Sequence, residues 1–313
     1  MFTTYPNITD PFVHTYSIVV CDPHTGQMGV AVQSHYFSVG STVPWAEAGV
    51  GAVATQAFAN IDYGPEGLAL MRQGLNAEQA LETLLKHDEG REIRQVALVD
   101  SQGNIAVHTG SRCIPAAGHL MGNNFSVQAN MMVNDLVWPA MKQAYEEAEG
   151  DLADRMIAAL EAAQTAGGDI RGQQSAAMLI VSGEQQQKPW HGHLFDVRVD
   201  DHPRPVEELK RLVSLRKAWL LFDQSNELAL AQQFDEAVSL LRKAMELRSD
   251  ITELKFRGTL ILLLAGEEQE ALTLLREVFA KEPIWAELVP RVASVGLLPN
   301  DPALLKRILD QRS

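Results

Sequence analysis

The sequence predicts a mixed α+β domain, in which layered β-sheets are covered by helices, followed by a smaller all-helical domain. Three observations support this. Strand-like and helix-like segments are mixed over residues 15–199, the chain is helical from residue 206 onward, and the segment DHPRP (residues 201–205) separates the two parts. Two prolines so close together end a strand ladder and disfavour helix just before them. We therefore predict domains at residues 1–202 and 203–313, with residues 1–14 as an N-terminal extension.

The first domain contains two predicted β-hairpins. Residues 14–20 and 28–34 are rich in β-branched side chains, and Asp22, Pro23 and Gly26 favour a turn between them. Residues 94–100 and 104–110 flank a second turn, SQG. Apolar runs predict three further strands, at residues 49–58, 175–181 and 193–199.

Helical spacing predicts two helix pairs, at residues 65–74 and 77–88 and at residues 136–148 and 152–165. Asn76 is a candidate N-cap for the second helix. The order is strands, helix pair, strands, helix pair, strands. This order favours layered sheets over a regular βαβ alternation.

The helical domain contains an internal repeat. FDEAVSLLRKAMELRSD and EEQEALTLLREVFAKEP align with Ala237 on Ala271, a spacing of 34 residues. The second unit also carries Gly266 and Pro283, where tetratricopeptide repeats favour these residues. The segment 219–287 therefore resembles tetratricopeptide repeats. Since two repeats are few for a solenoid, we expect flanking helices or the first domain to cap them.

The composition narrows the possible partners. The 313 residues carry a net charge of -14, which disfavours binding to nucleic acid or to an anionic membrane surface. Cys21 and Cys113 are the two cysteines of the chain, which excludes a disulfide scaffold and fits a reduced, cytoplasmic setting. The N-terminus lacks the pattern of a signal peptide, and no apolar run is long enough to span a bilayer. We expect a cytoplasmic protein without a cofactor.

Two short motifs have alternative interpretations. GVGAVA, residues 49–54, matches a dinucleotide fingerprint, but β-branched residues follow it where a helix is required. We interpret it as a strand whose glycines allow close sheet packing. His191 and His193 could bind a metal if Asp196 or His202 supplied a third ligand, but no established metal motif is present. We interpret these histidines as part of a solvated turn and predict no metal site.

Three polar clusters lie at the ends of predicted strands, where side chains can face a cleft. The alternative for each cluster is a structural role, such as an ion pair between Asp169 and Arg171 that braces the loop. The first cluster contains Thr15, Ser17, Ser34 and His35; the second contains Thr55, Gln56, Asn60 and Tyr63; the third contains Asp169, Arg171, Gln174 and Ser175.

These clusters belong to stretches that resemble a bacterial family of unknown function in the N-terminal-nucleophile (Ntn) hydrolase superfamily. The resemblance covers residues 15–199 through HTYSIVVCDPHTGQMGVAVQS, VPWAEAGVGAVATQA, YGPEGLALMRQG, RQVALVD and GGDIRGQQSAA. It implies a four-layer αββα sandwich and cleavage of amide bonds. In this superfamily the nucleophile is the side chain of an N-terminal Thr, Ser or Cys, and its α-amine is the base. Thr15 takes that position here, but fourteen residues precede it, so a free amine requires cleavage of the His14–Thr15 bond.

Two main hypotheses follow. In the first, the protein hydrolyses an amide in a small molecule or short peptide. Thr15, Ser17, Asp169 and Arg171 would be catalytic, with the Asp169–Arg171 loop binding a substrate carboxylate. Gln56, Asn60 and Gln174 would bind or polarise the carbonyl group, and the remaining substrate-binding candidates are Ser34, His35, Tyr63 and Ser175. In the second, the protein is a non-catalytic scaffold that self-associates as a homodimer and binds a protein partner through the helical tail. A weaker third hypothesis is a metal-dependent hydrolase that uses His191 and His193.

Overall fold

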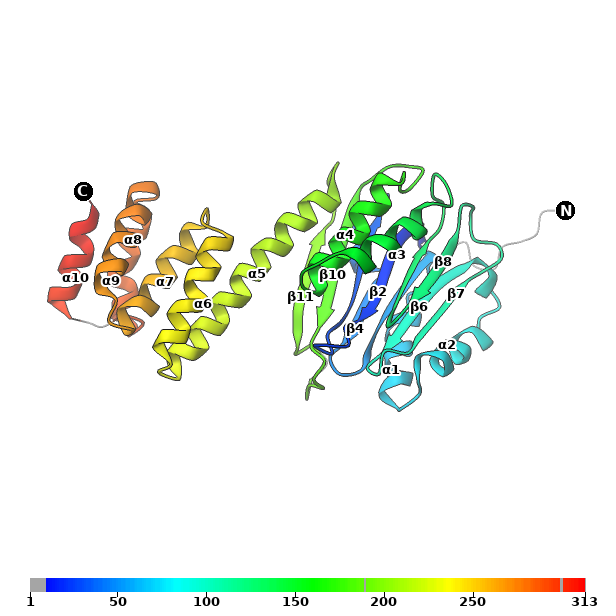
Figure 1. The fold of residues 1–313 in the computed structure, drawn as a ribbon, viewed down its shortest axis with the longest axis horizontal. Helices are drawn as coiled ribbons and strands as arrows, with labels where there is room; N and C mark the ends of the chain where they lie inside the picture. Colours follow the sequence, from blue (N-terminus) through cyan, green and yellow to red (C-terminus); the bar gives the residue numbers. More distant parts are fainter. Residues whose placement is uncertain (1–9, 189, 299–300, 313) are drawn as a thin grey trace. The chain divides into compact units, whose positions relative to one another are not determined.

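The structure is a computed structural model that describes residues 10–188, 190–298 and 301–312 (Figure 1). The chain divides into two compact units, Met1–Val213 and Ser214–Ser313. The division lies inside helix α5 (Pro205–Leu230) and not at the proline-containing segment before it. The reason is that the first turns of α5 belong to the first unit. Val206, Leu209 and Val213 are buried on one face of the helix, and Lys210 forms an ion pair with Glu161 of that unit.

The first unit contains two antiparallel sheets. The six-stranded sheet has the order β11-β10-β3-β2-β9-β8 and consists of β2 (Thr15–Cys21), β3 (Met28–Ser34), β8 (Gly118–Gly122), β9 (Phe125–Ala129), β10 (Ser175–Val181) and β11 (His193–Val199). The five-stranded sheet has the order β1-β5-β6-β7, and β4 also pairs with β5. Its strands are β1 (Phe12–Val13), β4 (Pro44–Glu47), β5 (Gly51–Phe58), β6 (Arg94–Asp100) and β7 (Ile105–Thr109).

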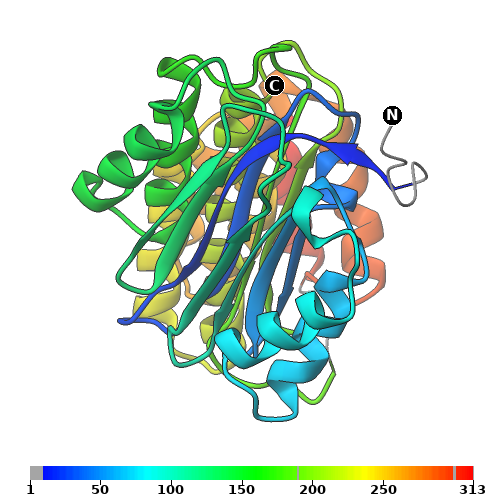
Figure 2. The same cartoon turned by 90° about the vertical axis from the view of Figure 1, so that its right-hand side faces the viewer.

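Helices cover the outer face of each sheet, which gives four layers in the order helix, sheet, sheet, helix (Figure 2). Helices α1 (Tyr63–Arg72) and α2 (Ala77–Lys86) pack on the five-stranded sheet, and α3 (Val137–Glu147) and α4 (Leu152–Thr165) pack on the six-stranded sheet. Short 3₁₀ turns occur at Val39–Ser41, Arg91–Ile93 and Asp310–Arg312. The predicted N-cap of α2 is confirmed: the Asn76 side chain accepts a hydrogen bond from the backbone of Gln79, whose side chain accepts one in return.

Both predicted hairpins are confirmed, because β2 pairs with β3 and β6 pairs with β7. The strand interpretation of GVGAVA is also confirmed, since β5 begins at Gly51 and continues as a strand. A Cβ atom at Gly51 would lie 2.5 Å from the carbonyl oxygen of Val99 in β6, so glycine allows the two strands to pair there. The sequence did not predict β1, β4, β8 or β9.

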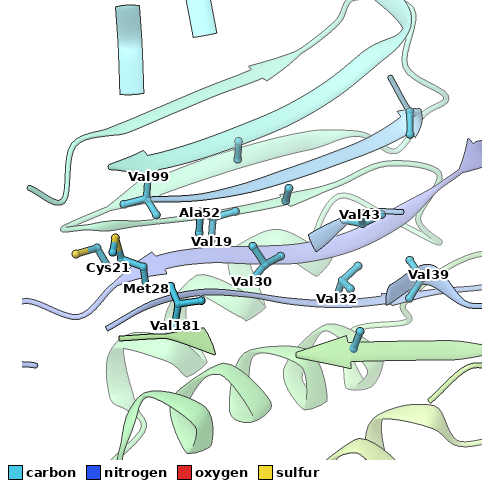
Figure 3. Close-up of a cluster of buried hydrophobic side chains, with 14 of the residues drawn as sticks. Val19, Cys21, Met28, Val30, Val32, Val39, Val43, Ala52, Val99 and Val181 are labelled. Carbon is cyan, nitrogen blue, oxygen red and sulfur yellow. The ribbon is translucent and has the colours of Figure 1, made fainter. Parts of the chain in front are cut away.

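Alternate residues of the central strands point between the two sheets, and most of this interlayer is apolar. Figure 3 shows this apolar cluster, which we call the apolar end and which contains Val19, Cys21, Met28, Val30, Val32, Val39, Val43, Ala52, Val99 and Val181. It extends along β3 as far as Val32, which lies opposite Ser17 of β2. All of these side chains are buried. Non-directional packing of apolar surface therefore joins the sheets here.

The second unit consists of the remainder of α5 with α6 (Phe234–Leu247), α7 (Thr252–Leu264), α8 (Glu268–Lys281), α9 (Ile284–Ser294) and α10 (Pro302–Leu309). Its helices repeat the 34-residue period of the sequence: α6 and α8 start 34 residues apart, as do the ends of α5 and α7. Buried residues repeat with the same period, as in the pairs Phe222 and Phe256, and Ala237 and Ala271. Beyond α8, helices α9 and α10 complete a second hydrophobic cluster.

Candidate functional site

The interlayer around the start of β2 carries buried polar side chains. We call it the polar end and define it by Thr15, Ser17, Ser34, Gln56, Gln95, Gln128 and Asn130, all of which are buried. Pairing explains why they meet: in the six-stranded sheet Thr15 lies opposite Ser34, and Ser17 lies opposite Gln128. In the facing sheet Gln56 lies opposite Gln95. Strands β2, β5 and β6 therefore carry polar interlayer residues at one end and apolar ones at the other.

A chain of hydrogen bonds crosses the polar end from one sheet to the other. The Ser17 hydroxyl donates to Oε1 of Gln56 at 2.6 Å and accepts from Nε2 of Gln128 at 2.6 Å. Gln56 in turn donates to Oε1 of Gln95 at 2.6 Å, and Asn130 donates to the same oxygen at 2.8 Å. Since these amides and hydroxyls are buried, each bond removes a desolvation cost, and together the bonds fix the side-chain positions.

Two donors meet at the backbone carbonyl of His14, the residue before Thr15. The Ser34 hydroxyl donates to this oxygen at 2.6 Å, and Nη2 of Arg171 donates to it at 2.8 Å. A hydroxyl and a guanidinium on one carbonyl oxygen polarise it and favour negative charge there. The Thr15 hydroxyl is adjacent in sequence and donates to the carbonyl oxygen of Val13 at 3.1 Å.

The loop before β10 supplies Arg171 and its carboxylate partner. Nη2 of Arg171 lies 2.7 Å from Oδ2 of Asp169, whose side chain is fully buried. Asp169 also accepts from the backbone N–H groups of Arg171 and His35, at 2.9 and 3.3 Å. The predicted bracing ion pair is therefore present, and the loop also reaches the start of β2 as the sequence predicts. Asp169 orients Arg171 toward the His14 carbonyl.

The His14 ring is buried beside this carbonyl. Its Nδ1 pairs with Oδ1 of Asn130, while Nε2 has no hydrogen-bond partner among the described residues. Burial, with a smaller contribution from the nearby Arg171 charge, lowers the pKa of His14 to about 4. The imidazole is therefore neutral at pH 7.

Residues 10–14 lie over the polar end as an added strand. Phe12 and Val13 form β1 and pair with Phe58 and Ala57 of β5. The Phe12 ring lies 5.2 Å from the Phe58 ring between centroids. This segment, together with the sheets, leaves Thr15 and His14 fully buried.

Four predicted site residues direct their side chains to structural contacts, although two of them, Gln174 and Ser175, lie beside Ser34 in the sheet. Asn60 accepts from the backbone of Asp62 just before α1, and the Tyr63 hydroxyl donates to Asp88 at 2.7 Å. Burial and the Asp88 carboxylate raise the pKa of Tyr63. Gln174 donates to Asp201 at 3.2 Å, and the Ser175 hydroxyl donates to the Tyr36 carbonyl at 2.5 Å. None of these bonds reaches the His14 carbonyl.

Sequence reasoning missed Gln95, Gln128, Asn130 and His14. In β9, polar Ser126 and Gln128 alternate with apolar Phe125 and Val127, a pattern that indicates a strand with one solvated face. Here both faces are buried, and the polar one faces the second sheet. Among the described residues, no group of three or more His, Cys, Asp or Glu side chains is placed to bind a metal ion.

Comparison with known proteins identifies the first unit. Residues 15–209 match a family model described as family of unknown function (DUF1028). The chain belongs to this family. The crystal structure of protein SPO2555 from Silicibacter pomeroyi, assigned to DUF1028, is similar: it is 32% identical, with a TM-score of 0.57, and the match covers 64% of this chain and 88% of that one. No curated protein matches the chain.

The DUF1028 match begins at Thr15, the first residue of β2, and ends inside α5. It therefore includes both sheets, apart from β1, and the helices that cover them. Residues 1–14 and the 34-residue repeats lie outside it. In the part of the chain that the structure describes, no helix combines the length and the apolar character needed to cross a membrane.

Proposed function

We propose that this DUF1028 protein is a self-processing amide hydrolase whose nucleophile is Thr15. The observation that carries the proposal is the pair of donors on the His14 carbonyl, from Ser34 and Arg171. This carbonyl belongs to the peptide bond that must break before Thr15 gains a free α-amine. An oxygen that already accepts from a hydroxyl and a cation is prepared for the negative charge of a tetrahedral intermediate.

Self-processing proceeds as follows. The Thr15 hydroxyl oxygen attacks the His14 carbonyl carbon, and the developing oxyanion is stabilised by Ser34 and Arg171. The bond between His14 and the Thr15 nitrogen breaks, an ester forms on the Thr15 oxygen, and the hydroxyl proton passes to the nitrogen. Water then hydrolyses the ester. The products are a His14 carboxylate and a chain that begins at Thr15 with a free amine and a restored hydroxyl.

The same groups then act on a substrate amide. The Thr15 amine takes the proton of the hydroxyl as the oxygen attacks the substrate carbonyl; the proton leaves with the amine product, and water hydrolyses the acyl ester. An α-amine has an ordinary pKa of about 8, so the amine is a competent base near neutral pH.

The fold assignments that accompany this function are part of the proposal. The helix, sheet, sheet, helix layering supports an Ntn-hydrolase-like αββα sandwich. The match beginning at Thr15 supports residues 1–14 as an extension that precedes the catalytic domain. The 34-residue spacing of helix ends and buried residues supports tetratricopeptide-like packing of the second unit.

Intact-mass measurement under denaturing conditions tests the proposal. We expect the purified wild-type chain to lose the mass of residues 1–14 with time, and Thr15→Ala to stay intact. Thr15→Ser keeps a hydroxyl and should still be cleaved. Thr25→Ala, which removes a threonine hydroxyl from the β2–β3 turn, is the matched control and should be cleaved at the wild-type rate.

Arg171→Met tests the oxyanion role. Loss of one such donor typically slows a reaction by about 10² to 10³-fold, so cleavage should slow by that order. A wild-type chain that remains intact and active, together with an active Thr15→Ala variant, would contradict the mechanism.

A second candidate function, a protein-binding role for the helical unit, is favoured by a separate surface. On α9, a pocket of about 230 Å³ is lined by Ile284, Trp285, Glu287, Leu288 and Arg291, and Ile284 is 65% exposed. An exposed apolar pocket on a helix suits a protein partner or a second copy of the chain. Size-exclusion chromatography with light scattering of wild type and Ile284→Glu would show whether this surface supports a dimer.

A further inference from the structure

We infer that residues 10–14 occupy the acyl-side substrate cleft, and that the cleft is built for an extended peptide with an acidic side chain at the fifth position and an aromatic side chain at the third position before the cleaved bond. This inference rests on the proposed function, because it takes the His14–Thr15 bond as the first bond cut. The contacts of residues 10–14 then describe how a substrate would bind.

The backbone of this segment binds as a strand would. Phe12 and Val13 pair antiparallel with Phe58 and Ala57. The Pro11 carbonyl accepts from the backbone N–H of Ala59 at 3.0 Å and from that of Val13 at 3.2 Å, which adds a three-residue turn at Phe12. These bonds use main-chain groups, so any extended peptide could make them. Removal of β1 would leave this end of β5 as an unpaired edge that ends beside the Thr15 site.

Side-chain contacts add specificity at the far end of the segment. Nη1 of Arg94 lies 2.8 Å from Oδ2 of Asp10, and the same nitrogen donates to the Phe58 carbonyl at 2.6 Å. Arg94 is 5% exposed, and Nε of its guanidinium is held at 2.9 Å by Asp88. A buried and oriented guanidinium recognises a carboxylate far better than a mobile surface lysine does.

The middle of the segment is recognised by an aromatic contact. The Phe12 ring meets the Phe58 ring edge to face, and the guanidinium carbon of Arg171 lies 5.7 Å from the Phe12 centroid. Arg171 therefore contacts both the third residue before the cleaved bond and the carbonyl of that bond. Such a shared contact would couple the binding of an aromatic side chain to the position of the catalytic donor.

The direct test measures binding without chemistry. It uses the full chain with Thr15→Ala to remove the nucleophile, and with Asp10→Asn and Phe12→Ala to weaken the attached segment. The probe is a fluorescein-labelled peptide, Asp-Pro-Phe-Val-His, followed by fluorescence anisotropy. We expect saturable binding, and at least tenfold weaker binding of peptides in which Asn replaces the aspartate or Ala replaces the phenylalanine.

Two comparisons complete the test. The Thr15→Ala chain with an otherwise intact segment should bind the probe at least tenfold more weakly, because the attached segment competes at a high effective concentration. Adding Arg94→Gln to the weakened chain should remove the difference between the Asp and Asn peptides. If the Arg94→Gln variant does not fold, the difference in affinity between the Asp and Asn peptides on the weakened chain that keeps Arg94 still tests the inference. Equal binding of all three peptides, or no binding, overturns the inference.

The inference and the proposed function fail in different ways. Selective peptide binding with an uncleaved wild-type chain would reject the hydrolase and leave a peptide-binding cleft. If the cleaved chain hydrolyses coumarin amides of all three peptides with the same kcat/KM, the proposed hydrolase function stands and the inferred specificity of the cleft is wrong.

Discussion

The polar and apolar ends of the interlayer are built on the same strands but join the sheets in different ways. Strand β2 contributes Ser17 to the polar end and Val19 to the apolar end, and β6 contributes Gln95 and Val99 in the same way. The apolar end packs without directional bonds (Figure 3). At the polar end, by contrast, each side chain is positioned by hydrogen bonds to named partners.

This difference assigns different tasks to the two ends. Apolar packing tolerates changes that keep volume, whereas a buried hydrogen-bond chain penalises the loss of any member, because the partner stays buried and unsatisfied. The apolar end therefore supplies general cohesion. The polar end fixes the place where His14, Thr15 and Arg171 meet, and a fixed geometry is what a catalytic site requires.

We expect the largest loss of stability when a polar-end side chain is replaced by an apolar one of similar shape. Gln95→Met removes the acceptor for Gln56 and Asn130 and the donor to the Ala129 carbonyl. We expect the free energy of unfolding to fall by about 4 kcal/mol, since each buried group left unsatisfied costs roughly 1–3 kcal/mol. The free energy of unfolding is measured by a urea titration in which the readout is hydrogen exchange of peptides from β2 and β6.

The opposite exchange tests the apolar end. Met28→Gln buries an amide among valines and should cost about 2 kcal/mol, while Met28→Leu keeps the apolar volume and should cost less than about 1.5 kcal/mol. If Gln95→Met were as mild as Met28→Leu, the polar end would be ordinary packing and the comparison would fail.

The next effect is the pH dependence of the polar end. His14 has a folded pKa of about 4, against an ordinary value of 6.5, so the unfolded chain binds its proton more tightly. Neutral His14 therefore contributes fully to the free energy of unfolding above about pH 6.5. This contribution is lost as the pH falls toward 4, by up to about 3 kcal/mol.

A difference measurement isolates His14 from other titrating groups, including His119, whose pKa burial also lowers. Both chains carry Thr15→Ala so that residues 1–14 stay attached, and one also carries His14→Gln. Urea midpoints at pH 7 and pH 4.5 should show a smaller loss of stability in the His14→Gln chain. Parallel losses would show that His14 titrates normally.

The comparison also explains which parts of the molecule sequence reasoning could predict. Local signals were sufficient for the hairpins, for the Asn76 cap and for the position of the Asp169–Arg171 loop. Each depends on neighbouring residues or on the end of a strand that an apolar run marks clearly.

The rest depended on pairing between distant segments. Strand β9 is five residues long, and its alternating pattern indicates solvent on the face that actually meets the second sheet. Asn130 directly follows β9, so a sequence analysis that does not predict this strand does not predict the position of Asn130 either. Asn60 and Tyr63 follow β5 closely, but Asn60 lies in the turn before α1 and Tyr63 is the first residue of that helix, and their side chains bond to Asp62 and Asp88. A polar residue near a strand end can thus lie in the site or beside it, and the sequence does not separate the two cases.

The smallest effect compares two positions on one face of β2. Ser17→Ala leaves Oε1 of Gln56 without its donor and Nε2 of Gln128 without its acceptor, so it should cost about 2 kcal/mol. Cys21→Ala removes one similar atom from the apolar end and should cost only about 1 kcal/mol, as small apolar truncations do. The two variants are compared by the urea concentration at which β2 peptides lose half of their protection from hydrogen exchange. The Ser17→Ala cost should largely vanish when Gln56→Leu and Gln128→Leu are already present, because the groups it would leave unsatisfied are then gone. An additive cost in that background would mean that Ser17 contributes through packing, as Cys21 does, and that the hydrogen-bond chain does not set the geometry around Thr15.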